Sequence, residues 1–172
     1  MNLMFTHDNA TYKGKHFNIE NLRCEPKPVQ NPFPICIGGR GERTLRVATK
    51  YAHLIDVYGV DKKTLHERLE FIKKCCADYG RDYERIVKSW GCWFWIYENE
   101  EELKRHSAEF NRLAMLRGGQ PDGVVKGTPE QIIIFFRDLV EMGITYFTLR
   151  FEDLPSKRGI RLFSEEVMPH LR

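Results

Sequence analysis

The feature that most constrains the fold is an alternation of short apolar segments with amphipathic helical segments, which begins at Ile35. Apolar, β-branched and aromatic residues predict strands over 35–37, 54–58, 86–97 and 144–151. The remaining periodicity predicts helices over 43–51, 62–79, 99–117, 128–142 and 162–171. Strands and helices that alternate in this way build a parallel sheet through right-handed crossovers. The sequence therefore predicts an α/β fold with a parallel sheet.

Local signals mark several of the helix ends. Asp61 is placed to cap the start of the 62–79 helix, and Gly80 lies just beyond its end. Asn99 precedes Glu102 by three residues, as in a capping box. Thr128, followed by Pro at the first helical position and Gln131 at the third, is typical of a helix start. A polar loop up to Gly127 is expected before it.

The residues before Ile35 have a different character. Thr11 to Ile19 reads as two short strands around a turn at Gly14, which predicts a hairpin. Residues 24–34 hold four prolines, which exclude helix and central strand. We therefore divide the chain into a hairpin and Pro-rich lead-in at 1–34 and an α/β domain at 35–172. The lead-in is interpreted as an extended connection, with a Pro-rich ligand for a binding module as the alternative.

Charge and composition exclude several classes of function. The net charge is +3, and Lys and Arg are interleaved with Glu, so nucleic acid is not an expected partner. No apolar run approaches the ~20 residues of a membrane span, and a cytoplasmic protein is expected. Five cysteines without a CxxC pair predict reduced thiols, and six scattered histidines without HExxH predict no metal site.

Several motifs in order resemble a known family. They are P-x-P-x-Q-x-P-x-P over 26–34, ICIGGRGER over 35–43, GRD over 80–82, GTPEQ over 127–131 and LFSEEVMP over 162–169. Together they resemble the luciferase-like monooxygenase family, in particular its coenzyme F-420-dependent oxidoreductase branch. The resemblance implies a TIM-type (β/α)8 barrel in which these segments are strands five to eight with their helices. Because 172 residues fall below the ~250 of a closed barrel, a half barrel is expected.

The resemblance also implies a function. It implies an oxidoreductase that uses coenzyme F-420 or FMN for hydride transfer or oxygen activation on a small organic substrate. In such enzymes the cofactor performs the chemistry, so no catalytic residue is named. The alternative is a non-catalytic flavin- or phosphate-binding module, or a truncated remnant. Because four parallel strands cannot close into a barrel, their edge strands stay unpaired. We therefore expect a homo-oligomer or pairing with a separate N-terminal barrel half.

The candidate cofactor-binding residues form the bend from Gly38 to Gly41. Gly38, Gly39, Arg40 and Gly41 follow a buried strand and open a helix, so backbone N–H groups can point at an anion. The alternative is that these glycines only make a tight turn. The resemblance favours cofactor contact.

Two further residues are candidates for binding substrate or an anion. Tyr58 and Arg150 lie at predicted C-terminal ends of strands, where barrel sites are built. Arg150 stands between Leu149 and Phe151, so its charge needs a partner. That partner is expected to be an internal carboxylate or an anionic ligand.

Overall fold

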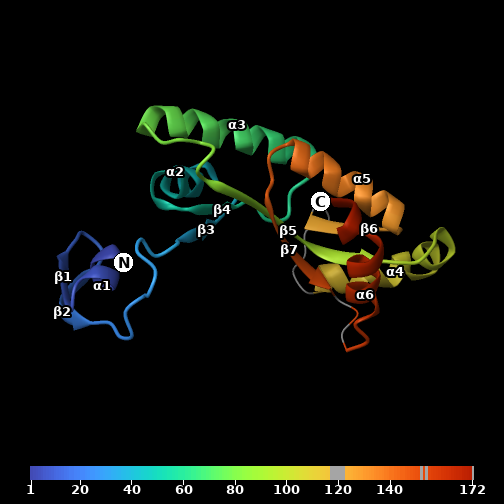
Figure 1. Cartoon of the computed structure of the whole chain (residues 1–172), viewed down its shortest axis with the longest axis horizontal. Coiled ribbons are helices and arrows are strands. Elements are labelled where there is room, and N and C mark those ends of the chain that lie inside the picture. Colours follow the sequence, from blue (N-terminus) through green and yellow to red (C-terminus); the bar gives the residue numbers. More distant parts are fainter. Residues whose placement is uncertain (117–122, 152, 154, 172) are drawn as a thin grey trace. The chain divides into compact units, whose positions relative to one another are not determined.

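The computed structural model describes residues 1–116, 123–151, 153 and 155–171. It divides into two units, Met1–Ile35 and Cys36–Arg172, each of which is described by itself. Figure 1 traces both units from the blue N-terminus to the red C-terminus. Among the described residues, no helix is both long and apolar enough to span a membrane.

The first unit is a hairpin with a short helix. It consists of α1 (Asn2–Thr6), β1 (Asn9–Lys13) and β2 (Asn18–Arg23), and the two strands pair antiparallel. The Gly14 N–H closes the turn by donating to the Phe17 carbonyl at 3.0 Å, so the predicted hairpin is confirmed. Residues 24–35 form neither helix nor strand. The Lys27 ammonium holds this segment by donating to carbonyls that include those of Met4 and Cys24, at 3.1 and 2.9 Å.

The second unit alternates strands and helices. Its elements are β3 (Cys36–Gly38), α2 (Glu42–Tyr51), β4 (Leu54–Asp56), α3 (Lys62–Tyr79), β5 (Val87–Ile96), α4 (Glu100–Leu116), β6 (Val124–Gly127), α5 (Pro129–Glu141), β7 (Tyr146–Phe151), α6 (Arg158–Glu166) and the 3-10 helix η2 (Met168–Leu171). Every strand pair in this unit is parallel. The predicted α/β fold with a parallel sheet is confirmed.

Strand β5 is the centre of the sheet. Its start pairs with β4, its end pairs with β6, and β7 pairs along residues 89–94. Strand β3 extends the sheet beyond β4. All these strands point the same way, so their C-terminal ends lie along one edge of the sheet, where α/β proteins place their sites.

Two segments differ from the sequence prediction. Residues Val124–Gly127 form strand β6, where a polar loop was predicted. The single helix predicted over 162–171 is instead α6, which begins at Arg158, followed by the separate η2. The predicted end of the 99–117 helix at Gly118-Gly119 lies outside the described residues.

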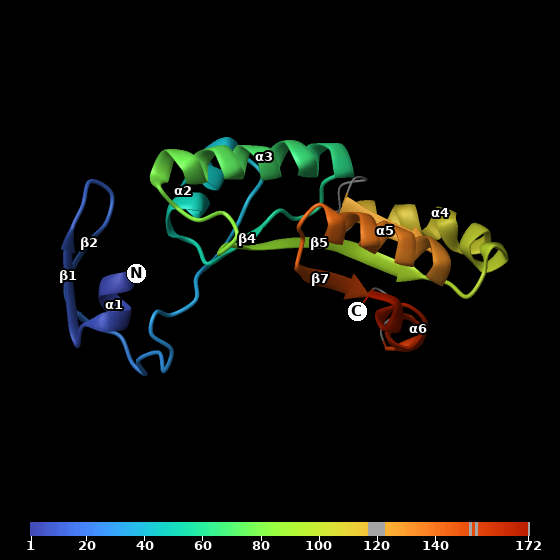
Figure 2. The same ribbon diagram turned by 45° about the horizontal axis from the view of Figure 1, so that its top comes forward.

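One face of the sheet is covered by helices. Figure 2 shows α2, α3 and α5 on the same side of β5 and β7. Alternate residues of β5 and helix side chains form a shared core: Leu45, Leu65, Leu69, Ile72, Trp90, Phe94, Ile132, Phe136 and Leu139 are among its buried members. Strand side chains on this face alternate with residues that point to the opposite face.

The opposite face carries polar and aromatic residues. Strand β7 alternates between half-buried and exposed positions, and its exposed residues are Tyr146, Thr148 and Arg150. Near the end of β5, the rings of Trp93 and Trp95 on this face pack with Phe110 of α4. This face is therefore more open near the N-terminal ends of β5 and β7 than near the C-terminal end of β5.

Helix ends follow the predicted caps. The Thr64 N–H donates to Asp61 Oδ1 at 2.9 Å, and Gly80 closes α3 in the left-handed conformation. The Thr128 N–H donates to Gln131 Oε1 at 3.1 Å at the start of α5. Arg81, from the GRD motif, donates to the Thr49 and Ala52 carbonyls at the end of α2. This motif therefore has a structural role between α2 and α3.

Candidate functional site

The Gly38–Gly41 bend lies at the C-terminal end of β3. Gly38 is the last residue of the strand, and Gly41 is the N-cap of α2. The first N–H groups of a helix have no intrahelical partner, and the positive end of the helix dipole lies behind them. The bend therefore presents main-chain donors at the edge of the sheet where ligands bind.

The glycines of the bend have different roles. The Gly39 N–H donates to the Asp56 carbonyl at 3.2 Å. This N–H therefore takes part in the sheet and is not available to a ligand. A Cβ at Gly39 would lie 2.4 Å from Thr44 Cγ2, which makes Gly39 a packing requirement. A Cβ at Gly41 would meet nothing within 4 Å. Gly41 thus leaves the start of α2 uncovered.

Arg40 connects the bend to the end of β4. Its Nε donates to the Tyr58 carbonyl at 3.2 Å. Its guanidinium packs against Gly59, which has a φ of +59° and where a Cβ would lie 2.6 Å from Arg40 Nη2. The structure therefore brings two of the predicted site residues, Arg40 and Tyr58, into contact.

A second arginine adds positive charge beside Arg40. Burial, and then the charge of Arg40, lower the pKa of the Arg68 guanidinium on α3. Arg68 Nη1 is shielded from solvent and has no hydrogen-bond partner among the described residues. The charges of Asp61 and Glu67 oppose this lowering, so nearby carboxylates offset part of the positive charge of the two guanidinium groups.

Tyr58 and Arg150 lie on the more open face of the sheet. The Tyr58 ring packs over Gly91, where a Cβ would lie 2.8 Å from Tyr58 Cδ2. Burial raises the pKa of the Tyr58 hydroxyl, and the charges of Arg150 and Arg40 oppose that rise. The Arg150 guanidinium carbon lies 3.9 Å from the centroid of the Trp93 ring. An aromatic face is thus one partner of Arg150. The internal carboxylate or anionic ligand that the sequence led us to expect stays a prediction.

Sequence reasoning missed a polar pair between these residues. Ser89 Oγ donates to Asp56 Oδ1 at 2.8 Å, across β4 and β5. Burial raises the pKa of Asp56, while the bond from Ser89 lowers it. The sequence did offer one signal, a carboxylate inside the apolar run 54–58, because a buried charge requires a hydrogen-bond partner. Among the described residues, no cluster of three or more His, Cys, Asp or Glu is placed to hold a metal.

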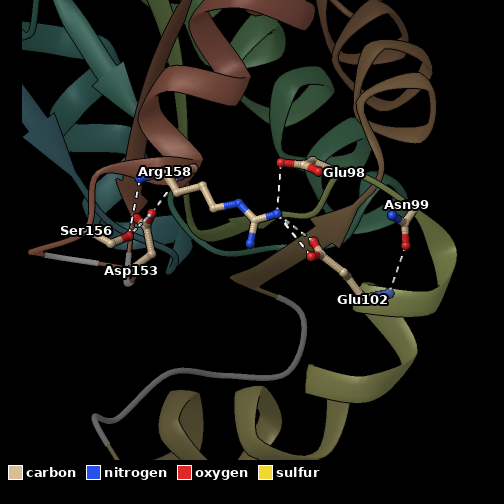
Figure 3. Close-up of polar contacts among 7 residues, drawn as sticks. Glu98, Asn99, Glu102, Asp153, Ser156 and Arg158 are labelled. Carbon is tan, nitrogen blue, oxygen red and sulfur yellow. Dashed lines mark hydrogen bonds and ion pairs between the residues drawn. The ribbon is translucent and has the colours of Figure 1, made fainter.

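A pocket opens at the C-terminal ends of β5 and β7. Its volume is about 230 Å³, and its lining includes Phe94, Trp95, Ile96, Tyr97, His106, Phe151, Asp153, Ser156, Arg158 and Gly159. Figure 3 shows Arg158, one of the lining residues, which reaches toward Glu98 and Glu102. The sequence analysis named Asn99 and Glu102 only as helix-capping residues. It did not predict that Glu102 pairs with Arg158, because the two residues come from distant segments of the chain.

Comparison with known proteins places this fold in a family. A sequence model described as luciferase-like monooxygenase matches residues 1–131. The chain belongs to the luciferase-like monooxygenase family. Within 108 aligned residues it is 28% identical to a long-chain alkane monooxygenase of Geobacillus thermodenitrificans (strain NG80-2), covering 62% of this chain and 24% of that protein.

Solved structures agree in fold. The coenzyme F-420-dependent tetrahydromethanopterin reductase from Methanopyrus kandleri matches with a TM-score of 0.73 and 18% identity over 94% of this chain. A riboflavin lyase in complex with modified FMN and riboflavin matches with a TM-score of 0.74 and 16% identity over 95% of this chain. The chain covers 58% and 48% of these structures, about half their length. The predicted incomplete TIM-type barrel is confirmed.

Proposed function

We propose that this chain is the coenzyme-binding part of an oxidoreductase that uses FMN or coenzyme F-420 and acts on a small organic substrate. The bound coenzyme would supply hydride transfer or oxygen activation. The residues of the chain bind and orient it. The observation that carries the proposal is the exposed N-terminus of α2 at Gly41, next to Arg40.

The donor set of the bend fits a phosphate group, which both coenzymes carry. Amides of the first turn of α2 can each donate one hydrogen bond, and Gly41 has no side chain to block them. Arg40 stands beside them, held by the Tyr58 carbonyl. Charge-assisted bonds of this kind are stronger than neutral ones.

The sheet face beyond the bend provides further positioning groups. Tyr58 offers a ring over Gly91 and a half-buried hydroxyl, and Asp56 offers a half-buried carboxyl oriented by Ser89. The Arg150 guanidinium lies over the Trp93 ring. We propose that this face orients the ring system of the coenzyme or the substrate, with Tyr58 and Arg150 as the contacts.

Titration of the purified chain with FMN and with coenzyme F-420, followed by fluorescence, tests the proposal. Saturable binding of one coenzyme is expected, and Arg40→Gln is expected to weaken it about tenfold, because a charge-assisted bond to phosphate is lost. Arg85→Gln is the matched control, since it removes the same charge from a side chain that is 88% exposed in the segment before β5. Failure of both coenzymes to bind, or equal affinity of both variants, contradicts the proposal.

A reduction assay on the same samples distinguishes the two functions that the bend supports. Reduction of the bound coenzyme by substrate is expected for the oxidoreductase. Saturable binding without any reduction favours a non-catalytic coenzyme-binding module.

We also propose that the more open face of the sheet is covered by polypeptide that supplies further barrel strands. The relatives of known structure are about twice as long as the matched region, and Tyr146 and Thr148 are exposed on this face. Tyr146 is 53% exposed, which is unusual for the inner face of a barrel, where side chains fill the core.

A further inference from the structure

The Arg40 side chain is held in place although the residue is exposed. Its Nε donates to the Tyr58 carbonyl at 3.2 Å, which fixes one edge of the guanidinium. A surface arginine ordinarily samples many rotamers, so a ligand that binds it has to order the side chain first. An arginine that the fold already orders avoids part of that cost.

Gly59 provides a second contact for the Arg40 guanidinium. A Cβ at Gly59 would lie 2.6 Å from Arg40 Nη2 and 3.7 Å from Arg40 Cζ. The guanidinium therefore occupies the space that any side chain at position 59 would take. Gly59 also has a φ of +59°, a left-handed conformation that glycine adopts without strain.

The backbone at Gly59 is fixed by its own contacts. The Gly59 N–H donates to the Gly91 carbonyl at 3.0 Å. At the next position, the Val60 carbonyl accepts from the indole N–H of Trp90 at 3.2 Å. The buried Gly123 packs against the same backbone, since a Cβ there would lie 2.9 Å from Gly59 Cα. Because these contacts hold the backbone, a methyl group at position 59 displaces the end of the flexible arginine side chain instead.

We propose that Gly59 is a positioning residue for anion binding at the Gly38–Gly41 bend. The absence of a side chain at position 59 holds the Arg40 guanidinium in place for the phosphate group of a coenzyme. The inference rests on the proposed function, which assigns Arg40 to that phosphate, and it adds a residue that acts through Arg40. Any side chain at position 59 then weakens the binding of a phosphate-bearing ligand, while a ligand without phosphate keeps its affinity.

The position of Arg40 is tested first, without any coenzyme. Gly59→Ala is compared with Gly80→Ala, where φ is similar at +64° and a Cβ meets nothing within 4 Å. Both variants carry the same kind of backbone strain, and only Gly59→Ala fills the space of the guanidinium. By NMR, Gly59→Ala is expected to shift the Arg40 Nε–H resonance and to speed its exchange with solvent, whereas Gly80→Ala leaves both unchanged. An Arg40 Nε–H that behaves alike in the two variants overturns the inference.

Binding is tested next with FMN and with riboflavin, which has the same ring system and no phosphate. Relative to the unaltered chain, Gly59→Ala is expected to bind FMN about tenfold more weakly, as Arg40→Gln does, and to bind riboflavin equally well. For a chain that binds coenzyme F-420 instead, the same comparison uses a deazaflavin without phosphate. Equal weakening of the two ligands means a general structural defect and overturns the inference.

A double variant shows whether Gly59 acts through Arg40. Once Arg40→Gln has removed the guanidinium, the addition of Gly59→Ala is expected to cost no further coenzyme affinity, because residues that act through one contact are not additive. A further loss of about tenfold in the double variant contradicts the inference. If the unaltered chain binds neither coenzyme, the proposed function fails, while the Arg40 resonance still decides whether Gly59 positions the guanidinium.

Discussion

The fold changes the pKa of Asp56, which lies between the other candidate site residues. Its carboxyl is half-buried and accepts the Ser89 hydroxyl at 2.8 Å. Burial raises its pKa, so the folded chain holds this proton more tightly than the unfolded chain does. The stability that this proton contributes is therefore present at acid pH, and it is lost as pH rises from the ordinary Asp value of about 3.9 through the raised folded value.

Removal of the Ser89 hydroxyl is predicted to raise the pKa of Asp56 further. In Ser89→Ala the carboxylate loses the hydrogen bond that favours its charged form, while burial remains. Titration of the Asp56 carboxyl carbon by NMR measures this directly. Ser164→Ala, at an exposed position of α6, is the control and should leave the value unchanged. A pKa of Asp56 at or below the ordinary value contradicts the structure.

Single residues also show where sequence reasoning ends. The glycines at 38–41 were recognised because a strand, a glycine bend and a helix follow one another in the chain. That the Gly39 N–H is used by the Asp56 carbonyl could not be predicted, because that bond depends on the register of β3 against β4. The pairing of Asp153 with Gly159 at the pocket was missed, because no motif marks it.

Local signals were sufficient for the helices of the second unit. Asp61, Asn99 and Thr128 begin helices as predicted, since a cap needs only residues within one turn. Strand β6 was missed because it is only four residues long and contains a lysine. Its pairing with β5, which the sequence does not show, stabilises it. Contacts distant in sequence decide such elements.

Helix α5 is predicted to stabilise the unit mainly through one ring. Phe136 is fully buried and contacts Phe94, Phe147 and Phe163 at ring-centroid distances of 4.9 to 6.0 Å. Phe136→Ala should lower the free energy of unfolding by about 3–5 kcal/mol, through lost burial and a cavity. Urea denaturation followed by circular dichroism measures this change.

The same helix offers the control for this prediction. Ile134 is 61% exposed, so Ile134→Ala should change the free energy of unfolding by less than about 0.5 kcal/mol. Similar losses for Phe136→Ala and Ile134→Ala would mean that α5 does not pack on the sheet as described.

At the scale of the whole molecule, β3, β6 and β7 each pair with a single strand among the described residues, and β7 exposes Tyr146 and Thr148 on one face. Unpaired strand edges pair readily with other strands. We predict that the chain sediments as a species heavier than its 20.3 kDa, through association of this face with a second copy. Tyr146→Lys should shift the chain toward the monomer, because it places a charge on the exposed face of β7.

Val140→Lys, on the outer side of α5, is the control for the association experiment. Val140 is 46% exposed, so the substitution adds a charge away from the sheet face and should leave sedimentation unchanged. A compact, stable monomer in the unaltered chain contradicts self-association and favours a separate polypeptide as the missing barrel half.

The central claim is that the first turn of α2, left uncovered at Gly41, binds the anionic group of a coenzyme. Backbone amide NMR of the chain during titration with FMN and with coenzyme F-420 tests it most directly. We predict saturable shifts of the Gly41, Glu42 and Arg43 amides, while the Gly39 amide remains protected from exchange by its bond to the Asp56 carbonyl. Saturable binding that leaves these three amides unmoved and shifts resonances elsewhere would contradict the account.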